Sequence, residues 1–198
     1  LGEGEDCGGL FALPGFIDAH VHIESSQLIS SRFAEAIMPC GTTTIIADPH
    51  EIANVCGMDG INFMIADAAS TPLEVRMMMP SCVPASPAES GGAVLDAHEV
   101  AKALARDDIF GLGEMMNYPG VTGGDADVLG KLAAARAAKK PIDGHFPGGK
   151  GLELAAYAAE GISSDHVCND ADVARDKLAA RMDVFIRQGS AGKQLLSI

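Results

Sequence analysis

Short apolar runs alternate with amphipathic, alanine-rich segments along the whole chain. The apolar runs predict strands at 13–23, 42–47, 73–79, 109–112, 141–144, 162–164 and 184–187. Between them, hydrophobic residues recur at spacings of three and four, as on one face of a helix. Leu152 and Leu178 are expected on such inward faces, and a last helix is expected at 190–198. Strands that alternate with helices predict right-handed β-α-β units and a parallel sheet.

Several polar residues indicate where these helices begin. Ser25 or Ser26 is expected to cap the first helix, and Asp125 to cap the one before the fifth strand. Asp96 and Glu99 have the spacing of a capping box, in which each side chain satisfies a free backbone N–H group of the other. The hydrophobic spacing and the capping residues therefore predict the same starting points for these helices.

Two histidines stand two residues apart in the stretch PGFIDAHVH at 14–22. Side chains alternate across a strand, so His20 and His22 are expected on the same face at its tip. Two neutral imidazoles that converge in this way form half of a transition-metal site. A lone histidine is more often a core or surface residue, but the pair favours a metal.

Further candidate ligands follow other predicted strands. Glu114 follows the fourth strand in a predicted loop, His145 the fifth and His166 the sixth, whereas His98 falls within a predicted surface helix. In a (β/α)8 barrel the carboxyl ends of all strands surround one mouth. An open doubly wound sheet would instead concentrate ligands at one switch point between two strands. The spread over several strands favours the barrel.

Four imidazoles and one carboxylate suffice for two divalent metal ions if Glu114 bridges them. Nitrogen and carboxylate ligands without thiolate suit manganese, iron or zinc. Taken singly, Glu114 could cap a helix, and His145 and His166 could lie in surface turns. His50, which follows the second strand, could carry a proton, contact substrate or be structural.

Composition narrows the class of protein. The chain has 198 residues and a net charge of −13, which argues against binding to nucleic acid or to an anionic membrane surface. Five widely spaced cysteines without a Cys-x-x-Cys motif resemble the reduced thiols of a cytoplasmic protein. No apolar stretch approaches the length of a membrane span.

The strand count falls short of a closed barrel. Seven strands are predicted, and a complete barrel of this kind typically needs about 250 residues. We therefore expect the catalytic barrel to occupy 13–198 without its eighth strand, as part of a longer protein. The open strand edges would favour association, so we expect a homo-oligomer.

Several stretches are similar to one known group of enzymes. Residues 14–22 resemble the first strand of the amidohydrolase superfamily of metal-dependent deaminases and cyclic-amide hydrolases. Within it, the adenine deaminases are resembled most closely, over 22–26, 41–54, 80–84, 111–120, 142–145 and 161–166. The stretch GEMMNYPG is specific, because most of the superfamily places a modified lysine where Glu114 falls.

The resemblance implies roles for these residues. His20 and His22 would bind one metal ion and His145 and His166 a second, manganese or iron ahead of zinc. Glu114 would bridge the two ions, and with His50 it would serve catalysis.

It also implies a substrate and a longer chain. Glu24 would lie near adenine, the small-molecule substrate, whose exocyclic amine is replaced to give hypoxanthine and ammonia. The family also carries a metal-binding aspartate on strand eight, beyond this chain, and a small leading β domain, of which 1–12 would be a remnant.

Two other functions stay open on the sequence. Another amidohydrolase reaction, such as opening a cyclic amide like dihydroorotate or hydantoin, would use the same residues. A non-catalytic metal-binding module would keep the histidines and lack the aspartate of strand eight.

Overall fold

The computed structural model describes residues 4, 7–86, 88–189 and 192–198. Strands β1 to β5 form one sheet in sequence order, and β6 and β7 form a second pair. All ladders are parallel. The strands are β1 (Phe16–Val21), β2 (Thr42–Ala47), β3 (Glu74–Met79), β4 (Gly111–Met115), β5 (Ile142–Gly144), β6 (Ser164–Asp165) and β7 (Asp183–Val184).

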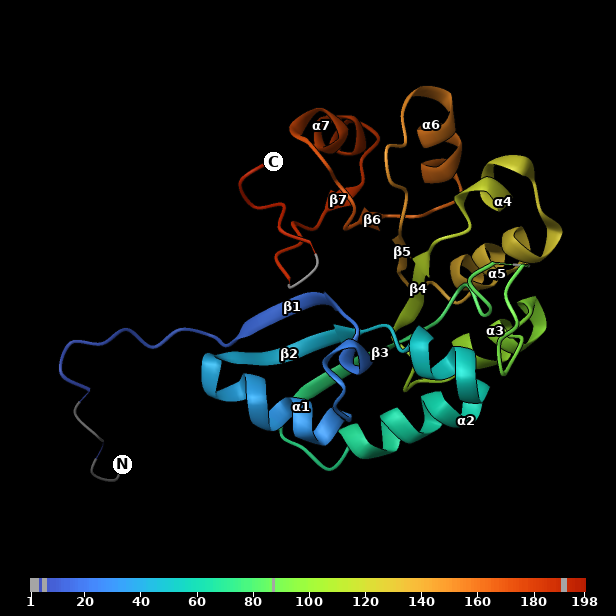
Figure 1. Ribbon diagram of the computed structural model, residues 1–198. Coiled ribbons are helices and arrows are strands. Elements are labelled where there is room, and N and C mark those ends of the chain that lie inside the picture. Colours follow the sequence, from blue (N-terminus) through green and yellow to red (C-terminus); the bar gives the residue numbers. More distant parts are fainter. Residues whose placement is uncertain (1–3, 5–6, 87, 190–191) are drawn as a thin grey trace.

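Helices connect successive strands and pack on the outside of the curved sheet (Figure 1). They are α1 (Ser30–Ile37), α2 (His50–Ala68), α3 (Ala97–Leu104), α4 (Tyr118–Gly123), α5 (Ala126–Ala137), α6 (Gly151–Ala159) and α7 (Ala171–Ala179). Two 3₁₀ turns, η1 (Ile23–Ser26) and η2 (Met38–Cys40), flank α1. In the described part of the chain, no helix has the length and apolar character needed to cross a membrane.

The sequential strand order distinguishes a barrel from a doubly wound sheet. A doubly wound sheet reverses its strand order at a switch point, whereas a barrel adds each strand beside the previous one. The two sheets are also adjacent, because the Ser163 N–H donates to the Ile142 carbonyl, 3.1 Å away, and so joins β6 to β5. The fold is therefore an arc of a parallel α/β barrel, as the sequence predicted.

The main core lies between the strands and the outer helices. Alternate strand residues such as Ile45, Met77 and Leu112 are buried against helix residues such as Ile61 and Leu132. A smaller cluster around Cys168 and Val173 lies under α7. The outer helices therefore cover one face of β2, β3 and β4, and the strand ends are left to carry polar side chains.

The helix caps are confirmed in two places and wrong in one. Asp96 accepts a hydrogen bond from the Glu99 N–H at 2.9 Å, and Asp125 accepts one from the Val128 N–H at 3.0 Å. Ser25 and Ser26 lie instead within η1, and α1 begins only at Ser30. Gln27, with a φ of 63°, adopts the left-handed conformation and separates the two segments.

Some element boundaries and faces also differ from the prediction. β4 extends to Met115, so Glu114 lies inside a strand and not in the following loop. β7 is Asp183–Val184, shorter and earlier than the predicted 184–187. Leu152 and Leu178 are 90% and 58% exposed, because Leu154 and Lys177 occupy the inward positions of α6 and α7.

The helix expected at 190–198 does not form in the described part, 192–198. Gln188 and Lys193 form an antiparallel bridge there, and the Gly189 N–H donates to the Gly192 carbonyl at 2.7 Å. Glycine is a poor helix former, so a tight turn is favoured at this point. Residues 190 and 191 lie outside the described residues.

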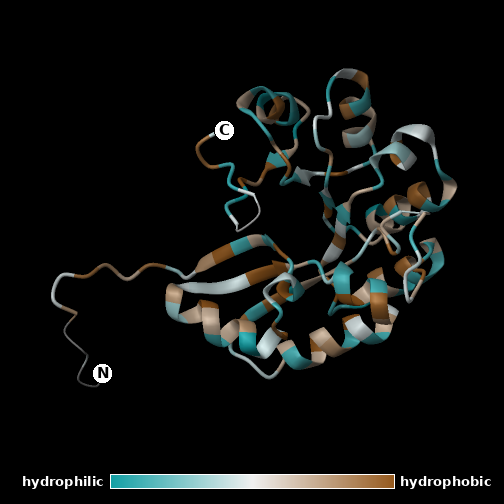
Figure 2. Ribbon diagram, in the orientation of Figure 1, coloured by the Kyte–Doolittle hydropathy of each residue, from teal (hydrophilic) through white to brown (hydrophobic). Residues whose placement is uncertain are grey.

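The edge of β1 that faces away from β2 has no partner strand among the described residues. No ladder joins β1 to β7 among the described residues, and Phe16 and Ile17 are 66% and 65% exposed. Figure 2 shows hydrophobic residues along β1 and the segment that leads into it. An exposed apolar strand edge is a template for pairing with another chain.

We therefore expect the 198-residue chain, purified by itself, to associate in light-scattering measurements. Ile17→Lys should reduce this association, because a charged edge strand disfavours edge-to-edge pairing. Leu152→Lys, which changes an equally apolar and 90% exposed residue on α6, is the matched control and should leave the association intact. A monodisperse monomer of the unchanged chain would contradict the prediction.

Candidate metal centre

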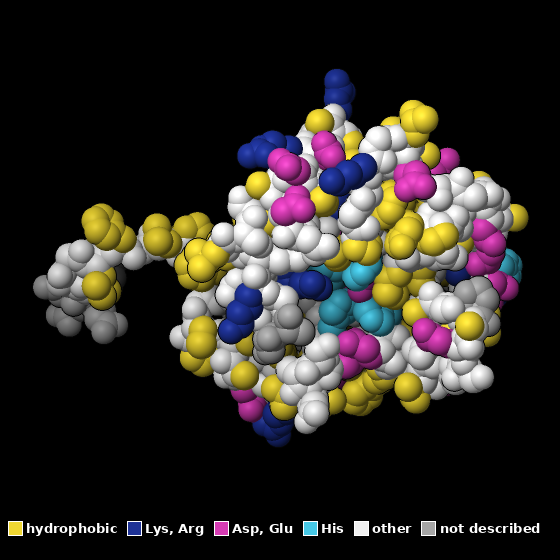
Figure 3. All heavy atoms as spheres, turned by 45° about the horizontal axis from the view of Figure 1, so that its top comes forward, with side chains coloured by type: hydrophobic (Ala, Val, Ile, Leu, Met, Phe, Trp, Pro, Cys, Tyr) yellow, Lys and Arg dark blue, Asp and Glu magenta, His cyan; other side chains and the backbone are white. Residues whose placement is uncertain are grey.

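The structure brings all five predicted ligands together at one end of the strands. His20 lies in β1 and Glu114 in β4, while His22, His145 and His166 directly follow β1, β5 and β6. Figure 3 shows a group of histidines lining a hollow on this face, with acidic side chains beside them. The rings of His20 and His166 stack with centroids 3.8 Å apart, so the two ends of the arc meet here.

Glu114 occupies the centre of the group. Its Oε1 is 3.2 Å from His22 Nε2, and its Oε2 is 3.0 Å from His166 Nε2. Oε2 also contacts His145 Nδ1. One carboxylate oxygen therefore faces the first histidine pair and the other oxygen faces the second pair. His20, His22 and Glu114 form one group with metal-ligand spacing, and Glu114, His145 and His166 form another.

The far side of two imidazole rings is fixed by hydrogen bonds. His20 Nδ1 is 2.7 Å from Asp143 Oδ2, and His22 Nδ1 is 2.9 Å from the Asp48 carbonyl oxygen. The Nδ1 atom donates in each case, because both partners are acceptors. This leaves the two Nε2 atoms, 3.0 Å apart, unprotonated and available as ligands in the neutral rings.

Asp48 and His50 extend the cluster from the end of β2. Asp48 Oδ2 accepts the Glu114 N–H at 2.8 Å, and a Cβ on Gly113 would lie only 2.2 Å from this oxygen. Glycine at 113 is thus required for the approach. His50 Nδ1 lies 3.4 Å from Glu114 Oε1 and 3.7 Å from Asp48 Oδ1. The structure therefore places His50 beside the predicted bridging carboxylate.

Glu24 and His98 lie apart from this cluster. Glu24 Oε1 accepts the Ile52 N–H of the first turn of α2 at 3.2 Å, and burial raises the pKa of its carboxyl. Its contact with a substrate stays a prediction. His98 is exposed on α3, where the sequence placed it.

The electrostatics of the cluster favour positive charge on the rings. Burial alone would lower the pKa of His22, but Glu114 and Asp48 raise it to about 10. Burial opposes protonation of His166 too, and Asp143 and Glu114 raise its pKa to about 9. Burial would raise the pKa values of Glu114 and Asp143, yet the neighbouring imidazoles hold both well below the usual range.

These residues fit a divalent cation. In the described part of the chain, four buried polar atoms at the cluster have no hydrogen-bond partner: Asp48 Oδ1, His50 Nδ1, Glu51 Oε2 and His166 Nδ1. Imidazole nitrogens and carboxylate oxygens that converge on one point form the ligand set of a transition metal. A bound cation would replace protons on the rings, so its binding would weaken as the pH falls.

Four supporting residues escaped the sequence analysis. Asp143 orients His20, as described above. Asp165 accepts the N–H groups of Phe146 and Val167, the residues directly after His145 and His166, at 2.8 and 2.7 Å.

The other two come from helices. The Lys177 ammonium group lies 2.9 Å from Asp165 Oδ1, and both side chains are fully buried. The Tyr157 hydroxyl contacts the backbone at His145.

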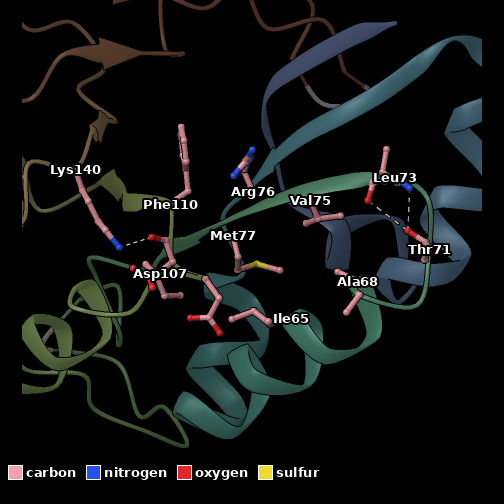
Figure 4. A pocket seen from close by; sticks show the side chains of 13 residues that line it. Ile65, Ala68, Thr71, Leu73, Val75, Arg76, Met77, Asp107, Phe110 and Lys140 are labelled. Carbon is pink, nitrogen blue, oxygen red and sulfur yellow. Dashed lines mark hydrogen bonds between the residues drawn. The ribbon is translucent and has the colours of Figure 1, made fainter.

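A cavity of about 650 Å³ opens beside the histidines. Residues of β1 line one side and residues 185–189 the other, with His20, His22 and His166 in its wall. A second cavity of about 480 Å³ lies at the opposite ends of the strands (Figure 4). Its cations are already paired: Lys140 donates to the carbonyls of Arg106 and Ile109, and Arg76 pairs with Glu74. Of these two cavities, the first borders the predicted ligands and runs along the edge of β1 that is unpaired among the described residues.

The arc of parallel strands and the carboxylate-centred histidines at its mouth together define a parallel α/β barrel with a candidate metal site. More specifically, residues 11–188 match the amidohydrolase family, and the chain belongs to that family.

Curated relatives are similar over nearly the whole chain. Adenine deaminase from Nitratidesulfovibrio vulgaris (strain Hildenborough) is 50% identical over 190 residues, which is 96% of this chain and 33% of the relative. Adenine deaminase from Methanoregula boonei is 51% identical over 98% of this chain and 34% of its own length. Adenine deaminase from Clostridium acetobutylicum is 49% identical over 96% and 33%. The chain thus spans about a third of the curated relatives it matches.

One solved structure supports the fold independently. An oxaloacetate acetylhydrolase matches with a TM-score of 0.56 and 12% identity, over 89% of this chain and 67% of that one. At this identity the likeness concerns the fold alone.

Proposed function

We propose that the protein is an adenine deaminase. It would replace the exocyclic amine of adenine by oxygen from water, giving hypoxanthine and ammonia. The central position of Glu114, with one oxygen toward each histidine pair, carries the proposed chemistry. The choice of adenine is supported by the three relatives of that name, which are about half identical to this chain.

His20 and His22 would hold one divalent ion, His145 and His166 a second, and Glu114 both. Manganese or iron is proposed, with zinc as the alternative, because the ligands offer nitrogen and carboxylate oxygen without thiolate. When bound, such a pair supplies a hydroxide nucleophile at neutral pH and polarises the electrophilic carbon. His20, His22 and His166 line the 650 Å³ cavity, which leaves them accessible to a substrate.

His50 is proposed to move the proton. In deamination the C–O bond forms, the C–N bond breaks, and the leaving amine needs a proton to depart as ammonia. Burial opposes protonation of His50, but Asp48 raises the pKa of the ring, which favours the protonated form. Its Nδ1 lies 3.4 Å from Glu114 Oε1, within reach of the reacting groups.

Glu24 is proposed to contact the substrate. One of its oxygens accepts a hydrogen bond from the Ile52 N–H. The raised pKa of this carboxyl would help it to donate to a ring nitrogen. A cytoplasmic location and a role in purine salvage are proposed with this activity. The unbridged thiols of Cys40, Cys56, Cys82 and Cys168 agree with that location.

The natural full-length protein, supplied with manganese, should release one ammonia and form one hypoxanthine for each adenine consumed. The absorbance change and an ammonia assay measure both products. Dihydroorotate and hydantoin are tested in parallel, and their cyclic-amide rings should not be opened. Ring opening of either without ammonia release from adenine would replace the proposed substrate and keep the family. No reaction with any of the three would leave a metal-binding module as the better description.

A further inference from the structure

The hydroxyl of Tyr157 connects the two strand ends that carry Glu114 and His145. Tyr157 lies in α6 and is fully buried. Its hydroxyl accepts the His145 N–H at 2.9 Å and donates to the Met115 carbonyl at 2.7 Å. One oxygen atom therefore ties the residue after Glu114 to the backbone of a predicted metal ligand.

The sheet itself is irregular at this point. Met115 pairs with Gly144, and the register between β4 and β5 shifts between Leu112 and Met115. A Cβ on Gly144 would lie 3.2 Å from Tyr157 Cε1 and 2.5 Å from the Ser164 carbonyl oxygen. Glycine at this position lets the tyrosine ring reach the gap between the strand ends.

The hydroxyl is suited to a permanent structural bond. Burial raises the pKa of Tyr157 well above its usual value, so the group stays protonated and keeps its donor. The ring packs against Phe146 with centroids 5.0 Å apart, which restricts its movement.

We infer that Tyr157 is a positioning residue that sets the spacing between Glu114 and His145, and thereby shapes one half of the metal centre. This rests on the proposed function, because it concerns the ion that Glu114, His145 and His166 would hold. His22 faces the other oxygen of Glu114, so an ion held by His20 and His22 would not depend on the hydroxyl. Loss of the hydroxyl should therefore affect the two ions unequally.

The test is a titration of the metal-free, full-length protein with Co²⁺, followed by its visible absorption. Tyr157→Phe removes only the hydroxyl. It should weaken one of two binding steps by about 10-fold or more, the cost typical of losing an outer partner of a metal ligand. The affected step and the changed absorption bands should match those of His145→Ala and not those of His20→Ala. The other step should change little.

Tyr118→Phe is the matched control, since the chain has two tyrosines. The Tyr118 ring stacks on Phe146 at 4.5 Å, and its hydroxyl forms no hydrogen bond among the described residues. This variant should bind both ions as the unchanged protein does.

The outcomes separate the inference from the proposed function. If the unchanged protein binds fewer than two Co²⁺ ions, the proposed metal centre is wrong whatever Tyr157 does. If it binds two, and Tyr157→Phe weakens neither step or both equally, the inference alone is overturned. Should Tyr157→Phe fail to fold, 3-fluorotyrosine at position 157 keeps the shape and weakens the oxygen as an acceptor. It should weaken the same single step, and an unchanged step would again overturn the inference.

Discussion

Glu114→Ala should reduce the metal content of the full-length protein from about two ions to one or fewer. The side chain turns one carboxylate oxygen toward His22 and the other toward His166, so it faces both histidine pairs. Loss of an outer partner of a ligand already costs about 10- to 100-fold in metal affinity, so loss of a shared ligand should cost at least about 100-fold. Ammonia release from adenine should fall by about 10²-fold or more, because proton transfer alone contributes about 10²- to 10⁴-fold. Metal analysis and the ammonia assay measure these effects.

The same substitution should shift the titration of two histidines in the metal-free protein. Glu114 raises the pKa values of His22 and His166 against the effect of burial. Without this carboxylate both values should fall, which NMR can follow. Glu153→Ala removes an exposed carboxylate from α6 and should change neither metal content nor titration. Unchanged metal content in Glu114→Ala would reject the bridging role.

Lys177→Met should destabilise the fold by about 3–5 kcal/mol, the usual cost of leaving one partner of a buried ion pair uncompensated. Lys177 and Asp165 are both fully buried, and the ammonium group also donates to the Val167 carbonyl at 2.6 Å. For a domain of this size the melting temperature should fall by about 6–20 °C. Calorimetry of the metal-free protein measures the change.

Lys131→Met is a matched control for this variant. Lys131 is also buried, but its partner Asp127, 2.8 Å away, is 47% exposed. Water can solvate the carboxylate of Asp127 that is left behind, so the loss in the free energy of unfolding should stay at about 1 kcal/mol or less. In Lys177→Met, adding Asp165→Asn removes the buried charge and should restore part of the stability. Equal losses in the two lysine variants would contradict the argument.

The meeting of the five predicted ligands at one end of the strands could be predicted, because strand ends obey a simple geometric rule. Alternation along a strand placed His20 and His22 on one face, and the parallel order of the strands brought Glu114, His145 and His166 to the same end. The same rule, applied to Asp143 and His145, would also have found Asp143.

Lys177 and Tyr157 were harder to foresee, because their roles depend on tertiary contacts of helices. In α7 the buried positions are Val173, Ala174 and Lys177, so a lysine shares the apolar face. Hydrophobicity favours Leu178 for that face, so the sequence predicts the leucine on the inward side. Only the carboxylate of Asp165 behind the helix makes a buried lysine favourable, and sequence periodicity cannot reveal that partner.

The stacking of His20 on His166 has a further consequence for folding. No ladder closes the arc between β1 and the β6–β7 pair in the described chain, yet these rings meet at 3.8 Å. A cation shared by the two histidine pairs would act as a reversible cross-link between distant segments. The entropic cost of closing a loop grows only slowly with its length. A cross-link between segments at the two ends of the arc therefore costs little more entropy than one between near neighbours. By mass action, each tenfold rise in free cation above its dissociation constant would then add about 1.4 kcal/mol to the stability of the open arc.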